Sequence, residues 1–429
     1  MGRQPVSTIN VETAALVRHA SGRYGDAMAC EAIGRYVRHV GAIPDLAWGP
    51  MEWVQKWRTE WDEACNDRVR EATLASERFD DVGQTLYRVA ANYADADIRV
   101  AADLSALTGG PLMPFVEALG NPPGAVARPG EDLKFPDRHA SVSIPTIPDD
   151  TPVNHDLNIL RRDGSINERD LYPTGTDLSK TPETLRRAEL TTEGRRKLWE
   201  FITEWYSELK TAEKIVWQWG LAPAESSTGF IDQASAAWPG IIANRANLLR
   251  LGANAYRTLR ENMANQVKDL QQYWASPGAA SAYVIYASSL GRHHEALADN
   301  LQWLGDEGVK ASKTLDDLQL EFANLGFAHI ATISAQLRTY NEVAGSLSKD
   351  VGASLNGLAN AVNALTKSLI TSWEAAAAKA AATVSITEKV INRSPEFNNH
   401  NHALALPPSS PSNEWRGDGW KPGTRIPRP

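Results

Sequence analysis

The sequence predicts an all-α protein of more than one helical unit, and three observations support this. Apolar residues recur at steps of three and four over long stretches, which is the spacing of one helix face. Glycine and proline gather between these stretches, where turns are expected. At 429 residues the chain also exceeds what a single hydrophobic core usually serves, so length favours two or three units.

The first predicted unit covers residues 1–109 and consists of two helices that fold back on each other. Between them, Pro44, Gly49 and Pro50 mark the expected turn. A long helix follows and stops at the glycines and proline of 109–111, a typical helix end. Its apolar stripe requires cover from a second helix, and consists of Val82, Leu86, Val89, Tyr93, Ala96, Val100, Leu104 and Leu107.

Two cysteines, Cys30 and Cys65, lie on either side of the expected turn. Their midpoint falls between Ala47 and Trp48, so a symmetric hairpin would place them face to face. A disulfide then requires a Cα separation below about 7 Å. The alternative is that both are small buried apolar residues, as free cysteines commonly are.

Residues 110–190 are rich in proline and predict a mostly extended linker. Helical periodicity returns at Leu198 and continues to about 385, which predicts a second, longer hairpin with a last helix lying back along it. In this unit the stripe from Leu198 to Trp219 is expected to pack against a neighbouring helix. Residues 386–429 are polar and proline-rich and predict a disordered tail.

Composition and motifs narrow the function classes. The formal net charge of −8 disfavours nucleic acid as a partner, and no apolar run is long enough to predict a membrane span. Adjacent His293 and His294 point about 100° apart on a helix, so no functional metal or other cofactor is expected. No nucleophile–base pair or phosphate loop has a recognisable spacing, which favours a non-enzymatic protein; the densest polar cluster of the linker, from Asp149 to Asp156, is the place left for an activity.

One motif lies on the long helix of the first unit: Tyr93-x-x-x-Asp97, within LYRVAANYADADIRVAADL. With INVETAALVRHA and GRYGDAMACEAIGRYV, this segment resembles the EspC-like and WXG-type helical hairpins exported by type VII (ESX) secretion systems of actinobacteria. The resemblance covers about a quarter of the chain. It implies that Tyr93 and Asp97 form part of an export signal; the other reading is a core tyrosine beside a solvated aspartate.

The family's W-x-G turn is less closely matched. Trp48-Gly49 lacks the spacer, whereas Trp238-Pro239-Gly240 has it but precedes the expected second hairpin. The turn motif Trp274-x-x-x-Gly278 lies at the expected turn with two extra residues.

From this resemblance we expect a type VII secretion substrate that acts as a helical binding protein. Its partners would be the export machinery and a helical secretion partner, as a homo- or heterodimer. It would be made in the cytoplasm without a Sec signal peptide and be secreted or placed at the cell surface. The alternative is a cytoplasmic helical scaffold or chaperone-like partner of a secreted effector, whose exposed apolar stripes would hold its client.

Overall fold

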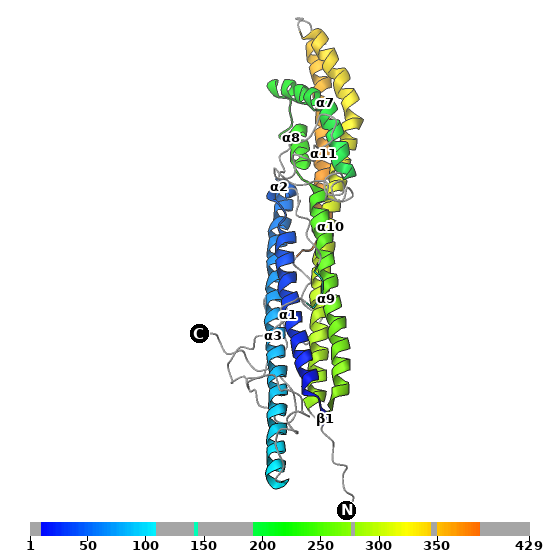
Figure 1. The fold of residues 1–429 in the computed structure, drawn as a ribbon. Helices are drawn as coiled ribbons and strands as arrows, with labels where there is room; N and C mark the ends of the chain where they lie inside the picture. The colour runs from blue at the N-terminus through cyan, green and yellow to red at the C-terminus, as the bar shows by residue number, and fades with distance from the viewer. Residues whose placement is uncertain (1–9, 109–140, 145–191, 276–278, 345–349, 387–429) are drawn as a thin grey trace, which may run out of the picture.

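The computed structural model describes residues 10–108, 141–144, 192–275, 279–344 and 350–386. These residues form an elongated rod of helices (Figure 1). The elements are β1 (Asn10–Val11), α1 (Thr13–Gly41), α2 (Asp45–Trp48), α3 (Glu52–Thr108), α7 (Glu193–Gln218), α8 (Ser227–Ser235), α9 (Pro239–Tyr273), β2 (Trp274–Ala275), α10 (Ala279–Val343) and α11 (Asp350–Thr383). The predicted all-α class is confirmed, with one two-residue strand pair in the described part.

The lower section of the rod in Figure 1 contains α1, α3, α9 and α10 up to about residue 310. The helices α1 and α3 pack against each other, as do α9 and α10, and α1 also contacts α9. Ion pairs connect α9 and α10 along this section: Arg250 with Asp306, Arg257 with Asp299 at 3.7 Å, and Arg260 with Glu295 at 3.1 Å. Their partners run in opposite directions along the sequence, so the two helices are antiparallel.

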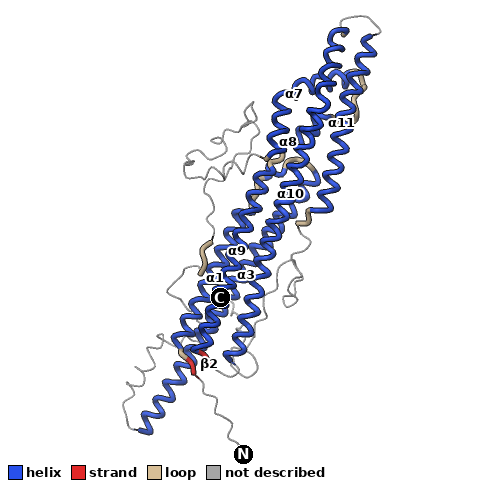
Figure 2. The backbone as a smooth tube through the Cα atoms, turned by 90° about the vertical axis from the view of Figure 1, so that its right-hand side faces the viewer, coloured by secondary structure: helices blue, strands red, loops and turns tan. Residues whose placement is uncertain are grey.

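The upper section contains α7, α8, α11 and α10 from about residue 311, and Figure 2 shows these helices gathered at the other end of the rod. Aromatic rings fill its centre. Phe322 stacks on Trp373 with centroids 6.3 Å apart, and Phe201 meets the edge of Phe327 at 5.4 Å. The single helix α10 therefore belongs to both sections and joins them.

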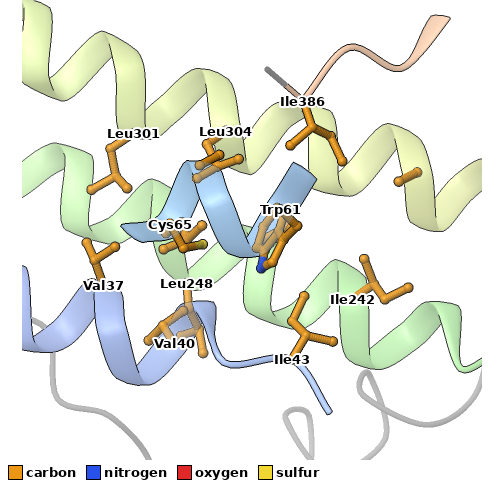
Figure 3. Packing of buried hydrophobic residues seen from close by; sticks show 14 of the residues in the cluster. Val37, Val40, Ile43, Trp61, Cys65, Ile242, Leu248, Leu301, Leu304 and Ile386 are labelled. Carbon is orange, nitrogen blue, oxygen red and sulfur yellow. The ribbon is translucent and has the colours of Figure 1, made fainter. Parts of the chain in front are cut away.

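Two buried tryptophans, Trp61 and Trp238, pack at the junction between the sections. The Trp61 indole donates to the Gly41 carbonyl at 2.8 Å, which closes the end of α1, and Figure 3 shows Trp61 between Ile43, Ile242 and Ile386. The Arg195 guanidinium lies over the Trp238 ring, 3.6 Å from its centroid.

Backbone contacts at this junction fix the short helix α2. The Trp238 amide donates to the Ala47 carbonyl at 2.8 Å, which ties α2 to the start of α9. Gly49 has a φ of +70°, a conformation that glycine adopts readily, and it lies against Ala237. The turn between α1 and α3 is thus fixed by the second half of the chain.

Two features differ from the sequence prediction. The helix α8 was not predicted. The expectation that Trp219 belongs to a packed stripe is wrong, because α7 ends at Gln218 and Trp219 is 58% exposed. Of the predicted linker the structure describes 141–144, where the Ser141 amide donates to the Gly25 carbonyl of α1 at 3.0 Å; the predicted tail beyond 386 lies outside the described residues.

Candidate functional site

The helix α3 extends beyond the α1 helix that covers it. A Cβ placed on Gly83 would lie 3.0 Å from the Ala20 carbonyl, which fixes the antiparallel register near this end. In the same register Thr13, the first residue of α1, faces about residue 90. The helix α3 continues to Thr108, so residues 91–108 project for about 27 Å at 1.5 Å per residue.

We call residues 91–108 the α3 overhang. Figure 1 shows it as the cyan end that passes below β1 and the ends of α9 and α10, and Figure 2 shows the same projection from the side. Tyr93 and Asp97 fall within the overhang, four residues apart on a continuous helix. At that spacing two side chains lie on one side of a helix, one turn apart. The positions of these two side chains lie outside what the structure describes.

A strand pair ties the start of α1, which faces the base of the overhang, to the end of α9. Val11 of β1 pairs with Trp274 of β2, and the Glu12 amide donates to the Tyr273 carbonyl at 2.9 Å. The Trp274 ring is buried and tilted against Tyr283, with centroids 5.8 Å apart. Trp274 of the predicted turn motif is therefore an anchor between α1 and α10, whereas Gly278 lies outside the described residues.

A buried polar cluster lies inside the bundle next to this anchor. The His19 imidazole shares a 2.6 Å hydrogen bond with the Tyr283 hydroxyl. Arg23 and Asp26, both fully buried, form an ion pair of 2.9 Å, and Arg23 also donates to Gln266. The Ser141 hydroxyl donates to Asp26 at 2.5 Å.

A hollow of about 320 Å³ leads from the surface to His19. Its lining residues are Ala15, Arg18, His19, Gln266, Asp269, Leu270 and Tyr273. No pair of carboxylates and no nucleophile lies there, so the part of the chain that the structure describes offers no recognisable acid–base or nucleophilic arrangement at this hollow.

Burial sets the protonation states of the polar cluster. It lowers the pKa of His19 well below its usual value, with Arg23 adding to the effect, and it lowers the pKa of His293 to about 3. The pKa of His294 falls for the same reason, and its ring stacks on Phe79 at 4.5 Å. Burial also raises the pKa of Asp26, and the Arg23 guanidinium offsets this only in part. The imidazoles are thus neutral at neutral pH.

The two cysteines do not face each other. Both are free and buried. A Cβ on Gly41 would lie 2.6 Å from the Cys65 sulfur, and one on Gly34 would lie 3.1 Å from Ala72, so Cys30 faces about residue 76. The hairpin midpoint assumed from the sequence is wrong by several residues, because α3 begins at Glu52 but Gly41, the last residue of α1, faces Cys65, so the first turns of α3 extend beyond the end of α1. Burial raises the pKa of both thiols, which disfavours the reactive thiolate.

The sequence analysis did not find the Arg23–Asp26 pair. The signal was present, because Leu16, Ala20, Arg23, Ala27 and Cys30 follow the helical step of three and four. An arginine within an apolar stripe indicates a buried charge that needs a partner. The linker positions 149–156, including His155, lie outside the described residues.

Comparison with known proteins adds no assignment. No family model, no curated protein and no solved structure matches the chain. Within the described ranges, no three His, Cys, Asp or Glu side chains are grouped so that they could hold a metal ion. No helix of those ranges has both the length and the apolar character needed to cross a membrane.

Proposed function

We propose that this protein is a substrate of a type VII (ESX) secretion system, that the α3 overhang is the segment recognised for export, and that the protein acts as a non-enzymatic helical binding protein. One observation carries the proposal. The Tyr93-x-x-x-Asp97 step lies on a helix that continues about 18 residues beyond the start of α1, so a receptor could approach it without opening the bundle.

The overhang is suited to recognition because its backbone is already helical. A receptor that reads an aromatic ring and a carboxylate one turn apart meets them in fixed order on a preformed helix, which lowers the entropic cost of binding. The base of this helix packs against α1, and β1 and β2 tie the start of α1 to the end of α9. The signal would therefore be presented at one end of a rigid rod.

In this proposal the two hairpin units have different roles. The first unit, residues 1–109, carries the signal, and the second, residues 191–385, carries the binding role. The Pro-rich segment 110–190 links them, and residues 386–429 form a disordered tail. A Pro-rich linker suits this arrangement because it spans distance without a core of its own.

A helical partner at the overhang is part of the proposal. The apolar positions of α3 that α1 buries include Val82 and Leu86. In the sequence the same spacing continues through Val100 and Leu104, beyond the start of α1. A helix from a secretion partner or from a second copy could continue the cover that α1 begins.

The test is export from an actinobacterium that has a type VII system. Tyr93→Ala and Asp97→Ala should each reduce the protein in culture filtrate to the level of a strain lacking the type VII ATPase. Cellular amount and far-ultraviolet circular dichroism should stay unchanged. Tyr273→Ala, which removes a tyrosine that is 40% exposed on α9, is the matched control and should be exported normally.

Equal amounts of wild type and both variants in the filtrate would contradict the signal assignment. Retention of all forms inside the cell, in complex with a second protein, would favour the alternative of a cytoplasmic scaffold or chaperone-like partner.

A further inference from the structure

The end of α7 displays large apolar side chains to solvent. Trp217 is 73% exposed, Trp219 is 58% exposed, and Leu221 is 37% exposed. We call these three residues, with Lys210 and Lys214 on the preceding turns, the α7-end surface. Large exposed tryptophans are typical of binding surfaces, where tryptophan is enriched among the residues that dominate affinity.

Backbone hydrogen bonds fix the position of this surface. The Gly220 amide donates to the Trp217 carbonyl and the Leu221 amide to the Val216 carbonyl, both at 3.0 Å. Gly220 has a φ of +69°. This is the Schellman arrangement that terminates helices. The backbone that carries both tryptophans is therefore held in place before a partner arrives, which lowers the entropic cost of binding.

A hollow of about 350 Å³ opens beside Trp217. It is lined by Lys210, Glu213, Lys214, Trp217, Ala222, Pro223, Ala224, Glu225, Ser226 and Val362. The uncharged part of the lining is mostly apolar and includes Trp217, Pro223 and Val362. A hollow of this size and lining accepts an apolar side chain from a partner.

The charged side chains at the hollow indicate which charge a partner should carry. The Glu213 carboxylate is already engaged by α8: it accepts from the Thr228 hydroxyl at 2.5 Å, from the Thr228 amide at 3.2 Å and from the Ser226 hydroxyl at 3.1 Å. In the part of the chain that the structure describes, neither Lys210 nor Lys214 forms an ion pair. Lys210 lies 5.8 Å from the Tyr206 ring centroid. Two ammonium groups thus remain for carboxylates of a partner. Glu225 also lines the hollow, so the acidic groups of a partner are expected to lie on the side of Lys210 and Lys214, away from Glu225.

We propose that the α7-end surface binds an acidic peptide segment of a partner protein, with one aromatic or aliphatic side chain in the hollow beside Trp217 and carboxylates paired with Lys210 and Lys214. The inference rests on the proposed binding role and names its partner chemistry, but it does not depend on export. The surface lies in the upper section, at the opposite end of the rod from the α3 overhang (Figure 1).

The first experiment selects peptides from a random display library on the full-length protein, with the Trp217→Ala/Trp219→Ala variant as counter-selection. The enriched peptides should contain an aromatic or aliphatic residue flanked by Asp or Glu. Peptides that are basic or uncharged, or that are recovered equally on the variant, would overturn the proposal, and so would a failure to enrich any peptide.

The second experiment measures the affinity of one enriched peptide by fluorescence anisotropy. Trp217→Ala should weaken binding roughly tenfold or more, as truncation of an interface tryptophan commonly does. Lys214→Glu should weaken it as well, and added salt should reduce the affinity of the wild type. Leu251→Ala removes an apolar residue that is 45% exposed on α9 and is the matched control, which should bind normally.

Circular dichroism of the variants should match the wild type because the tryptophans are exposed. Normal export of Trp217→Ala together with lost peptide binding would separate this inference from the export proposal. Unchanged peptide affinity in Trp217→Ala would refute it whatever the outcome for export.

Discussion

The two sections of the rod share α10 but differ in what fills their interiors. The lower section buries charged and polar groups, among them Arg23, Asp26 and His294. The upper section is filled around Phe322 and Trp373 by aromatic rings. Apolar burial is non-directional, whereas a hydrogen bond between two helices, such as that of His19 with Tyr283 or Arg23 with Gln266, forms only when the helices are in register. Buried hydrogen bonds also join helices of the upper section, such as Ser227 of α8 with Thr366 of α11 and Gln319 of α10 with the Ala234 carbonyl of α8. The sections therefore differ in buried ionisable groups, which the lower section has in the Arg23–Asp26 pair and its imidazoles, rather than in polar contacts as such.

The Arg23–Asp26 pair shows the cost of this arrangement. The pKa of Asp26 is raised, because the effect of burial exceeds the opposite effect of the Arg23 guanidinium 2.9 Å away. The ion pair therefore does not fully offset the loss of hydration, as is common for buried pairs. Arg23 and Asp26 are three residues apart on α1, so the pair itself joins no two helices. Arg23 contributes to helix pairing through its hydrogen bond to Gln266 of α9.

The largest predicted effect breaks this pair. Asp26→Ala should lower the free energy of unfolding by about 3–5 kcal/mol, because the Arg23 charge stays buried without its carboxylate. Urea denaturation followed by circular dichroism measures the change.

The double variant Arg23→Met/Asp26→Leu is the control for the charge. It should unfold within about 1 kcal/mol of the wild type, because buried pairs can often be replaced by apolar groups. A double variant that is as unstable as Asp26→Ala would show that hydrogen bonds to Gln266 and Ser141, rather than the charges, stabilise the site.

Acid should destabilise the lower section next most strongly. The pKa of His293 is lowered to about 3 in the fold, and is about 6.5 in an unfolded chain. The unfolded chain therefore binds more protons below pH 6.5, so the stability is complete above that pH and is lost as pH falls toward 3. At pH 4.5 this histidine alone accounts for about 3 kcal/mol, with His19 and His294 adding in the same direction. The raised pKa of Asp26 acts in the opposite direction.

Urea denaturation at pH 7.5 and pH 4.5 tests this difference. His294→Leu should reduce the acid sensitivity, because it removes one of the groups that must bind a proton. His329→Leu is the matched control in the upper section, where His329 is half-buried. Acid sensitivity that is the same in wild type and His294→Leu would contradict the role of the buried imidazoles.

The smallest predicted effect concerns the upper section. Gly220→Ala should destabilise by about 1–2 kcal/mol, because alanine is strained at a positive φ. No atom lies within 4 Å of the added methyl group, so only the backbone conformation is affected. Differential scanning calorimetry should show a lower melting temperature.

Gly352→Ala, near the start of α11, should change the stability in the opposite direction. Its added methyl group also meets no atom within 4 Å, but its φ is ordinary. Alanine in a helix is favoured over glycine by up to about 1 kcal/mol, so this variant should melt higher. Equal shifts for both variants would show that the left-handed conformation of Gly220 is not required.

Local pattern allowed the helical class to be predicted, but not the contacts between distant segments. The period of three to four residues marks helices such as α1 and α10 wherever the apolar face is continuous. The register of α1 on α3 depends on where α1 stops, and that is fixed by Trp61 and by the contact of α2 with Trp238, which comes some 190 residues later in the chain. A midpoint calculation on Cys30 and Cys65 cannot contain this information.

The candidate sites divide in the same way. The positions of Tyr93 and Asp97 on a helix could be predicted from spacing, whereas the overhang that leaves them beyond α1 follows only from the register. The exposure of Trp219 could not be predicted, because the same apolar stripe would suit a buried helix and only the helix end at Gln218 decides it.

Helix α10 runs from Ala279 to Val343, 65 residues without a proline. At 1.5 Å per residue it is about 98 Å long. A continuous α-helix is stiff along its length. A displacement of α10 in the lower section is therefore transmitted to the upper section, because no loop interrupts the helix between them. A partner bound at the lower section would therefore also set the position and orientation of the α7-end surface in the upper section.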